Sequence, residues 1–392
     1  MGARIEFFPV DNGDMTLLTL NGGRRILIDI NIRKAADDEN DSTTIDVASL
    51  LRSRLDRDED GRLYVDVFLL THPDKDHCSG LERHFHLGQP DEWNESEDKI
   101  LIKEMWSSPI IFRRQKEVEG GLCPDADAWW KEARRRARLY KSATRKEIIG
   151  SGNLIQILGE DKDNKTDDLT EILVKTNTEI VKICGVEEGD FRAWLLAPQL
   201  VCDDELEQLT GKNHSSTVIR FAIHADGMDG AGLFLTGGDA QVENWERVWK
   251  RNSDHPDRLT YNVLQAPHHC SWRSLSYDSW SDKGDSVKVS QDAREALAQA
   301  AEKSFIVASC KEIKDDKDPP CIRAKQEYID ILSARSGEFL CTASECENDV
   351  LTLEIDRNGP SRPSKKNKGG LLSGLAAAMP RKVEKDGGGR YA

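Results

Sequence analysis

The most informative stretch of the sequence is Thr71-His-Pro-Asp-Lys-Asp-His-Cys-Ser-Gly80. It directly follows the apolar run from Tyr64 to Leu70, which is typical of a buried strand. The stretch contains four candidate metal ligands, His72, Asp74, Asp76 and His77. Their spacing does not place all four on one side of a regular helix or strand, but a loop at a strand end can turn them toward one point. Imidazole and carboxylate ligands suit zinc, manganese or iron.

Taken alone, the stretch could also be an ordinary surface turn, because proline and aspartate are common turn residues. Two further fragments argue against that reading. Thr236-Gly-Gly-Asp239 and Pro267-His268-His269-Cys270-Ser271 also follow apolar runs directly. Three polar clusters at three strand ends predict one convergent site.

Composition limits the classes of protein to which the chain can belong. It has 392 residues, 38% of them hydrophobic and 32% charged, which is enough for one large domain or two smaller ones. The net charge of −15 argues against a general nucleic-acid binder. The nine cysteines include no CxxC pair, and neither a signal peptide nor a membrane-spanning apolar run is recognisable. We therefore expect a cytoplasmic protein with reduced cysteines and no membrane association.

The chain divides into an ordered part, an interrupting region and a tail. Residues 5–30 predict three strands, with Asn21-Gly-Gly23 as a hairpin signal. Asp29 closes the third strand, either as a loop cap or as a carboxylate that orients metal ligands. Residues 88–200 have a looser pattern and are expected to be an insertion into a domain over 1–356. Residues 357–392 predict a flexible basic tail.

A helix expected over residues 126–143 carries two tryptophans and several arginines. It could present a basic, aromatic-flanked surface to a phosphate backbone, or it could bury Trp129 and Trp130 and solvate its arginines. The second reading is the expectation. A protein partner could also bind through the insertion or the tail.

In order along the chain, the fragments resemble the metallo-β-lactamase superfamily, and more closely the soluble hydrolase domain of ComEC-type DNA-uptake proteins and its stand-alone relatives. The resemblance rests on the following motifs: Val10-Asp-Asn-Gly-Asp14, Ile26-Leu-Ile-Asp29, Thr71 to His77, Asn213-His-Ser-Ser-Thr-Val-Ile219, Leu233 to Asp239, and Pro267 to Ser271. It implies an α/β fold, an αββα sandwich, with a large insertion and the metals at one edge of its two sheets.

The resemblance also implies a role for each motif residue. His72 and Asp74 would bind one divalent metal, and Asp76 and His77 a second, together with His268 or His269. Asp239 would bridge the two ions, which would be manganese or zinc. The pocket and the surroundings of the ligands would be formed by Asp14, Asp29, Asn213 and Ser216. Two features depart from the family pattern, because Cys270 replaces a glycine and no histidine follows Ser309-Cys310.

The expected function is metal-dependent hydrolysis. The leading expectation is a phosphodiesterase or nuclease that acts on DNA or nucleotides. Asp76, His72 and Asp239 are the expected catalytic residues, because a metal can lower the pKa of a water molecule and two cations can stabilise a phosphoryl transition state. One alternative is hydrolysis of a non-phosphate ester, an amide or a thioester. Another is a protein-interaction or regulatory module with a partial metal site.

Overall fold

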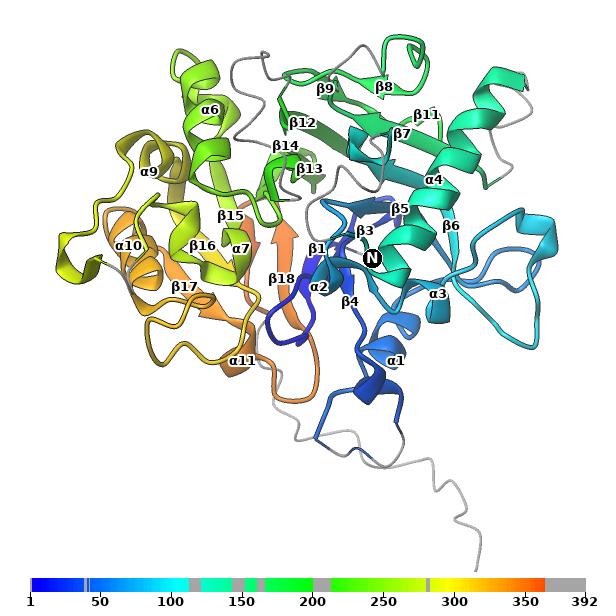
Figure 1. The fold of residues 1–392 in the computed structure, drawn as a ribbon, viewed down its shortest axis with the longest axis horizontal. Helices are drawn as coiled ribbons and strands as arrows, with labels where there is room; N and C mark the ends of the chain where they lie inside the picture. Colours follow the sequence, from blue (N-terminus) through cyan, green and yellow to red (C-terminus); the bar gives the residue numbers. More distant parts are fainter. Residues whose placement is uncertain are drawn as a thin grey trace, which may run out of the picture. The chain divides into compact units, whose positions relative to one another are not determined.

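A computed structural model describes residues 2–38, 41, 43–112, 121–142, 152–160, 166–199, 213–279 and 283–363. The compact unit runs from Met1 to Arg362. Its architecture is mixed α/β, with two large sheets and helices on either side of them (Figure 1).

The first sheet is half antiparallel and half parallel. Its strands, in spatial order, are β19 (Gly359–Ser361), β18 (Leu351–Asp356), β1 (Ala3–Phe7), β2 (Thr16–Thr19), β3 (Arg25–Ile28), β5 (Tyr64–Leu70), β6 (Leu101–Ser107), β7 (Leu154–Leu158) and β8 (Leu173–Val174). Pairing is antiparallel from β19 to β3 and parallel from β3 to β8. The predicted hairpin at Asn21–Gly23 joins β2 to β3, with Gly23 at a φ of 88°.

The second sheet is likewise divided into a parallel part and an antiparallel part. Its strands, in spatial order, are β17 (Glu338–Cys341), β16 (Ala300–Ala308), β15 (Tyr261–Gln265), β14 (Met228–Thr236), β13 (Val218–Ala225), β12 (Phe191–Ala197) and β9 (Glu179–Ile180). The first four are mutually parallel, and pairing from β14 to β9 is antiparallel. Short strands β4 (Ile30–Asn31), β10 (Lys182–Ile183) and β11 (Val186–Glu187) lie outside the two large sheets.

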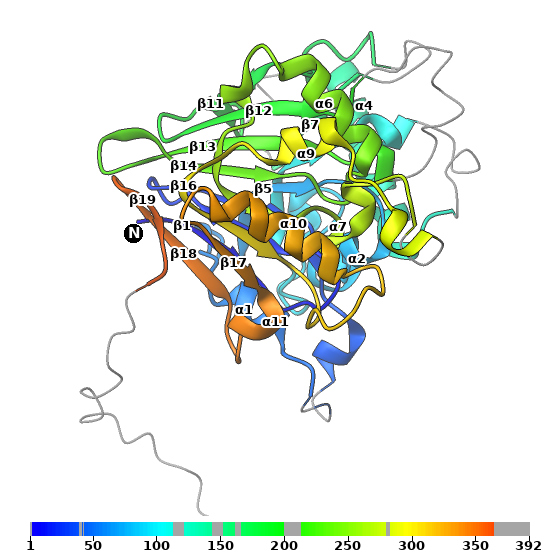
Figure 2. The same cartoon turned by 90° about the vertical axis from the view of Figure 1, so that its left-hand side faces the viewer.

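Helices cover the outer face of each sheet. The first face carries α1 (Val47–Arg52), α3 (Leu81–His84) and α4 (Pro124–Ser142). The second carries α6 (Val242–Asn252), α9 (Gln291–Leu297) and α10 (Ile322–Ser333), which face the viewer in Figure 2. The short helices α7 (Pro267–Cys270) and α11 (Thr342–Glu345) begin at or next to a strand end, and α2 (Lys75–Cys78) follows β5 after a short loop.

Three buried clusters give the order of the layers. Phe7, Ile26, Phe221 and Phe234 belong to one apolar cluster, so the inner faces of the two sheets pack on each other. A second cluster joins the first sheet to α1 and α4, and a third joins the second sheet to α6, α9 and α10. In α6, Val242, Trp245 and Val248 form the buried stripe that helical periodicity predicts. The layers therefore run helix, sheet, sheet, helix.

The region expected to be an insertion contributes strands to both sheets. Strands β6 and β7 continue the parallel half of the first sheet, and β12 pairs with β13 of the second. The looser sequence pattern arose because long connections separate these strands. Helix α4 buries Trp129 and Trp130, which are 1% and 2% exposed, as the amphipathic reading predicts, but it also buries Arg136, so its arginines are not all solvated.

One predicted boundary shifts. Strand β19 pairs with β18, so the compact unit ends at Arg362 instead of residue 356. The rest of the predicted tail, residues 364–392, lies outside the described residues. Within the described part of the chain, no helix combines the length and the apolar character that a membrane crossing needs.

Candidate metal centre

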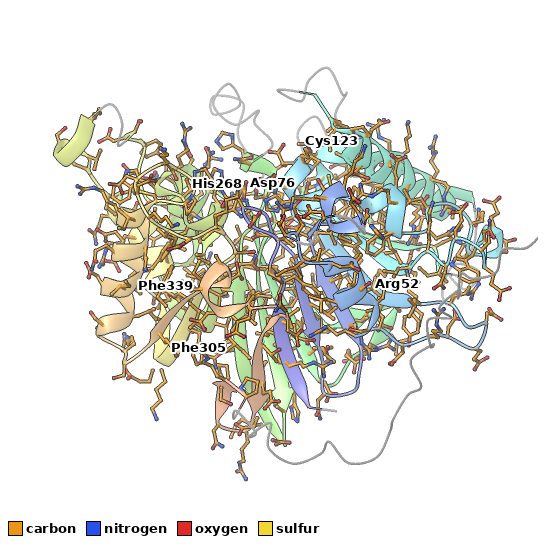
Figure 3. The ribbon with its side chains drawn as sticks, turned by 90° about the horizontal axis from the view of Figure 1, so that it is seen from below. Arg52, Asp76, Cys123, His268, Phe305 and Phe339 are labelled. Carbon is orange, nitrogen blue, oxygen red and sulfur yellow. The ribbon has the colours of Figure 1, made fainter. Side chains whose placement is uncertain are left out.

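The predicted site residues converge where strand ends of the two sheets meet. Asp29 follows β3, and the His72–His77 loop follows β5. From the second sheet, Asp239 follows β14, and His268 and His269 lie in α7 directly after β15. Figure 3 labels Asp76 and His268 at the same edge of the molecule, although they come from different sheets. The predicted convergence of three strand-end clusters is therefore observed.

Four buried side chains form the tightest group. Asp14, His77, Asp239 and His269 each offer one ligand atom, and these atoms all lie within 4.8 Å of one another. The sequence placed Asp14 among the pocket residues, but its Oδ1 lies 3.4 Å from Nδ1 of His269. A backbone hydrogen bond of 3.2 Å from Asp14 N to Asp76 O fixes this approach. The group can hold a metal ion.

The two carboxylate oxygens of Asp239 face different imidazoles. Oδ1 lies 3.0 Å from His77 Nε2 and 3.4 Å from His269 Nε2. Oδ2 lies 3.5 Å from His72 Nε2 and 3.5 Å from His268 Nε2. Sequence alone left open which of the paired histidines joins His77, and the geometry groups His269 with His77 and His268 with His72.

The two predicted aspartates of the loop lie at the rim of these groups. Asp74 Oδ2 is 3.8 Å from His72 Nε2, and Asp76 Oδ2 is 3.5 Å from His269 Nε2. Their side chains are 30% and 41% exposed, whereas Asp239 is 4% exposed. Each histidine pair therefore has one partly solvent-accessible carboxylate beside it.

Asp29 forms hydrogen bonds that fix the loop from Thr71 to His77. Its Oδ2 lies 2.8 Å from His77 Nδ1 and accepts a hydrogen bond of 2.6 Å from Thr71 Oγ1, while Oδ1 accepts one of 2.7 Å from Thr71 N. Asp29 itself adopts a φ of 53°, and it is fully buried. Of the two readings of this residue, the structure supports the carboxylate that orients a ligand, because a carboxylate on one ring nitrogen fixes the other toward a metal.

The histidine pair sits on an unusual backbone. His268, His269 and Cys270 have φ values of 51°, 54° and 66°, so three consecutive non-glycine residues are left-handed. A hydrogen bond of 2.9 Å from His268 N to Gly238 O ties this turn to the Asp239 loop. Such conformations cost about 1–3 kcal/mol each and occur mainly at functional sites. Cys270 thus occupies the left-handed conformation that glycine adopts most easily.

Gly238 permits a close approach between the two sheets at this point. It has a φ of 48°, and a Cβ atom added to it would lie 2.4 Å from Thr71 Oγ1. Any side chain here would push the Asp239 loop away from the His72 loop.

Burial and opposite charges shift the pKa values strongly. Burial alone raises the pKa of Asp239, but the surrounding imidazoles, led by His77, hold it well below its usual range. Burial lowers the pKa of His77, yet Asp239 and Asp29 raise it well above its usual value. For His269, burial is likewise outweighed by Asp239 and Asp14, which raise its pKa to about 10. In the absence of a cation, protons on these imidazoles would balance the buried carboxylates, and a divalent cation would take their place.

Several facing atoms are buried without a well-aligned hydrogen bond, and these atoms are Asp14 Oδ1, His72 Nε2, His77 Nε2, Asp239 Oδ1, and both ring nitrogens of His269. Buried polar atoms are rarely left without a partner. A cation among them would satisfy their lone pairs, so the nitrogen-and-oxygen set fits a divalent metal such as zinc or manganese.

The two remaining predicted pocket residues lie on the neighbouring segment. Asn213 begins the short helix η6 (Asn213–Ser215), and its carbonyl accepts a hydrogen bond of 3.1 Å from Ser216 N. Ser216 is fully buried with an unpartnered Oγ. The next residue, Thr217, donates from its backbone N to Thr71 O at 3.0 Å, which fixes this segment beside the His72 loop.

The chain matches no protein-family model. Nor does it match any curated protein.

Proposed function

We propose that this protein is a metal-dependent hydrolase of phosphodiesters, of the metallo-β-lactamase type, with two divalent ions at the candidate centre. The observation that carries the proposal is the position of Asp239, whose two oxygens face two separate pairs of imidazoles. A carboxylate in that position could be shared by two cations, and two-metal sites of this kind serve phosphatases and nucleases.

Each ion would have its own ligand set. One would be held by His77, His269, Asp14 and Asp76, and the other by His72, His268 and Asp74, with Asp239 shared. When bound, the ions supply Lewis-acid activation of water and neutralise charge at the phosphoryl group.

The chain's own residues would position the reactants. Asp76 is the most exposed of the carboxylates around Asp239, and its interaction with His269 helps to hold its pKa well below the usual range despite burial. It therefore remains an acceptor at neutral pH and can orient an attacking water molecule. Asp29 fixes the ring of His77 and so keeps its Nε2 directed toward Asp239.

Hydrolysis of a small chromogenic phosphodiester, bis(p-nitrophenyl) phosphate, tests the proposal with manganese or zinc added. The wild-type protein should release p-nitrophenolate, and Asp239→Asn should not. His224→Ala is a matched control, because His224 lies on β13 and pairs with Asp229 outside the centre. Metal binding without turnover of phosphodiester, carboxylic ester or thioester substrates would instead favour an interaction or regulatory module.

A further inference from the structure

A cavity of about 480 Å³ is lined by residues that closely follow Asp239 and His269 in the sequence. It lies between the start of α6, the segment after α7 and the loop at Asp316–Asp318, and its walls include Gln241, Arg273 and Tyr277. Its volume lies in the range of small-molecule sites, roughly 300–1,000 Å³.

Two wall segments continue directly from the centre, and a third is hydrogen-bonded to one of them. Gln241 is separated from Asp239 by Ala240 alone, and Arg273 follows the His268–Ser271 turn. Asp318 Oδ1 accepts a hydrogen bond of 3.0 Å from Trp272 N, which directly follows the His268–Ser271 turn. A substrate whose reacting group lies at the His268 side of the centre could therefore extend into this cavity.

Tyr277 presents an aromatic surface in the cavity. The residue is 60% exposed, which is unusual for a large side chain in the described part of this protein. Its hydroxyl donates to Glu246 Oε2 at 2.8 Å, and Ser290 Oγ donates to the other oxygen of Glu246 at 2.6 Å. The ring is thus held in place while much of its surface stays open to solvent, as in a stacking platform.

The charges on the cavity walls indicate which part of a substrate would bind there. Its walls carry four carboxylates and two cations, namely Glu243, Asp278, Asp316 and Asp318 against Arg273 and Lys317. This excess of negative charge opposes an additional phosphate group. Carboxylates do accept hydrogen bonds from the hydroxyl groups of a sugar and the amino groups of a base.

We propose that this cavity binds the nucleoside part of a phosphodiester substrate, with the base stacked on Tyr277 and the phosphate at the metal centre. The inference deepens the proposed function and rests on it for the chemistry of the substrate. It assigns to Tyr277 the selection of nucleotidyl esters over simple alkyl or aryl esters.

Binding of adenosine to the metal-loaded protein tests the cavity without requiring turnover. Saturation-transfer NMR should show adenosine bound to the wild type. Tyr277→Leu should weaken binding about tenfold, within the range expected for loss of one base–aromatic stack. Tyr277→Phe keeps the ring but loses the hydrogen bond to Glu246, so it should weaken adenosine binding less than Tyr277→Leu does. Equal adenosine affinity in Tyr277→Leu and wild type, or no binding to the wild type, would overturn the inference.

Kinetics provide the second measurement. For thymidine 5′-(p-nitrophenyl phosphate), Tyr277→Leu should reduce kcat/KM about tenfold, mainly through KM. For methyl p-nitrophenyl phosphate, which has no nucleoside, kcat/KM should not change. An equal loss on both esters would contradict a nucleoside subsite. If adenosine binding depends on Tyr277 but neither ester is hydrolysed, the nucleoside site stands and the proposed hydrolase activity fails.

Discussion

Asp29 Oδ2 lies 2.8 Å from His77 Nδ1, and both side chains are fully buried. This contact leaves Nε2 of His77 free to face Asp239 at 3.0 Å. A carboxylate behind a histidine is the arrangement that orients metal-binding imidazoles. It joins the end of β3 to the loop after β5, two segments that are adjacent because their strands pair in parallel.

Asp29→Asn should weaken metal binding about 10–100-fold, because the amide orients and polarises His77 less well than a carboxylate does. Competition with a chromophoric chelator measures the metal Kd. Asp37→Asn is the matched control, since Asp37 contacts His84 at 3.1 Å outside the centre. The same metal Kd in Asp29→Asn and wild type would rule out this orienting role.

Asp76→Ala should lower kcat on bis(p-nitrophenyl) phosphate about 10²–10⁴-fold if the carboxylate positions the attacking water. The thermal midpoint should change little, because the side chain is 41% exposed. Metal content must be measured on the same sample, and retention of at least one ion is expected because the buried residues Asp14, His77, Asp239 and His269 remain. Full activity of Asp76→Ala would remove Asp76 from the reaction.

Glu104, which lies away from the candidate metal centre, should make the stability of the fold depend on pH. Burial raises its pKa to about 7, although Cys184 N and Gln156 Nε2 donate hydrogen bonds to it. The folded protein therefore binds a proton at Glu104 more tightly than the unfolded chain does. The stabilisation that this proton provides is fully present below about pH 4.5 and is lost as the pH rises to about 7.

Relative to Glu104→Gln, the wild type should lose up to about 3 kcal/mol of unfolding free energy between pH 4.5 and 7. Urea unfolding of both proteins across this range measures the difference. Parallel stability profiles would show that Glu104 does not titrate in this way.

Helix α4 contains a buried ion pair, in which Arg136 Nε donates to Glu132 Oε1 at 2.7 Å and both side chains are at most 4% exposed. Glu132→Gln removes the opposite charge and should destabilise the fold by about 3–5 kcal/mol, because a buried guanidinium is left without a counter-charge.

Lys131→Gln is the control for that change. It removes the ion pair between Lys131 and Asp127, which lies one helical turn earlier in α4. Because Lys131 is 76% exposed, the loss of unfolding free energy should be below about 1 kcal/mol. Denaturant titration gives both values. Equal effects of the two substitutions would show that burial does not determine the contribution of the Arg136 pair.

The sequence predicted most of the candidate site, because its residues sit in short motifs directly after apolar strands. His72, His77, Asp239 and the histidine pair were identified in this way. The place of Asp14 was missed, since its approach to His269 depends on the contact of its backbone with Asp76 across the chain. The separate directions of His268 and His269 follow from three left-handed residues, which the residue types do not predict.

The fold was less predictable in the region 88–200. Strands β6 and β7 are typical apolar runs, but long connections separate them, and their parallel pairing involves contacts between distant residues. Local pattern identifies such strands but does not give their partners. The two-sheet core was expected from the family resemblance of the motifs and not from the local pattern of strands and helices.

The most direct test of the account is the number of metal ions bound by the wild type, Asp239→Ala, His72→Ala and His269→Ala. Native mass spectrometry after manganese or zinc loading gives this number, with His224→Ala as the control. We predict two ions in the wild type and the control, one in each of His72→Ala and His269→Ala, and none in Asp239→Ala. No bound ion in the wild type, or two ions in Asp239→Ala, would contradict a carboxylate-bridged centre.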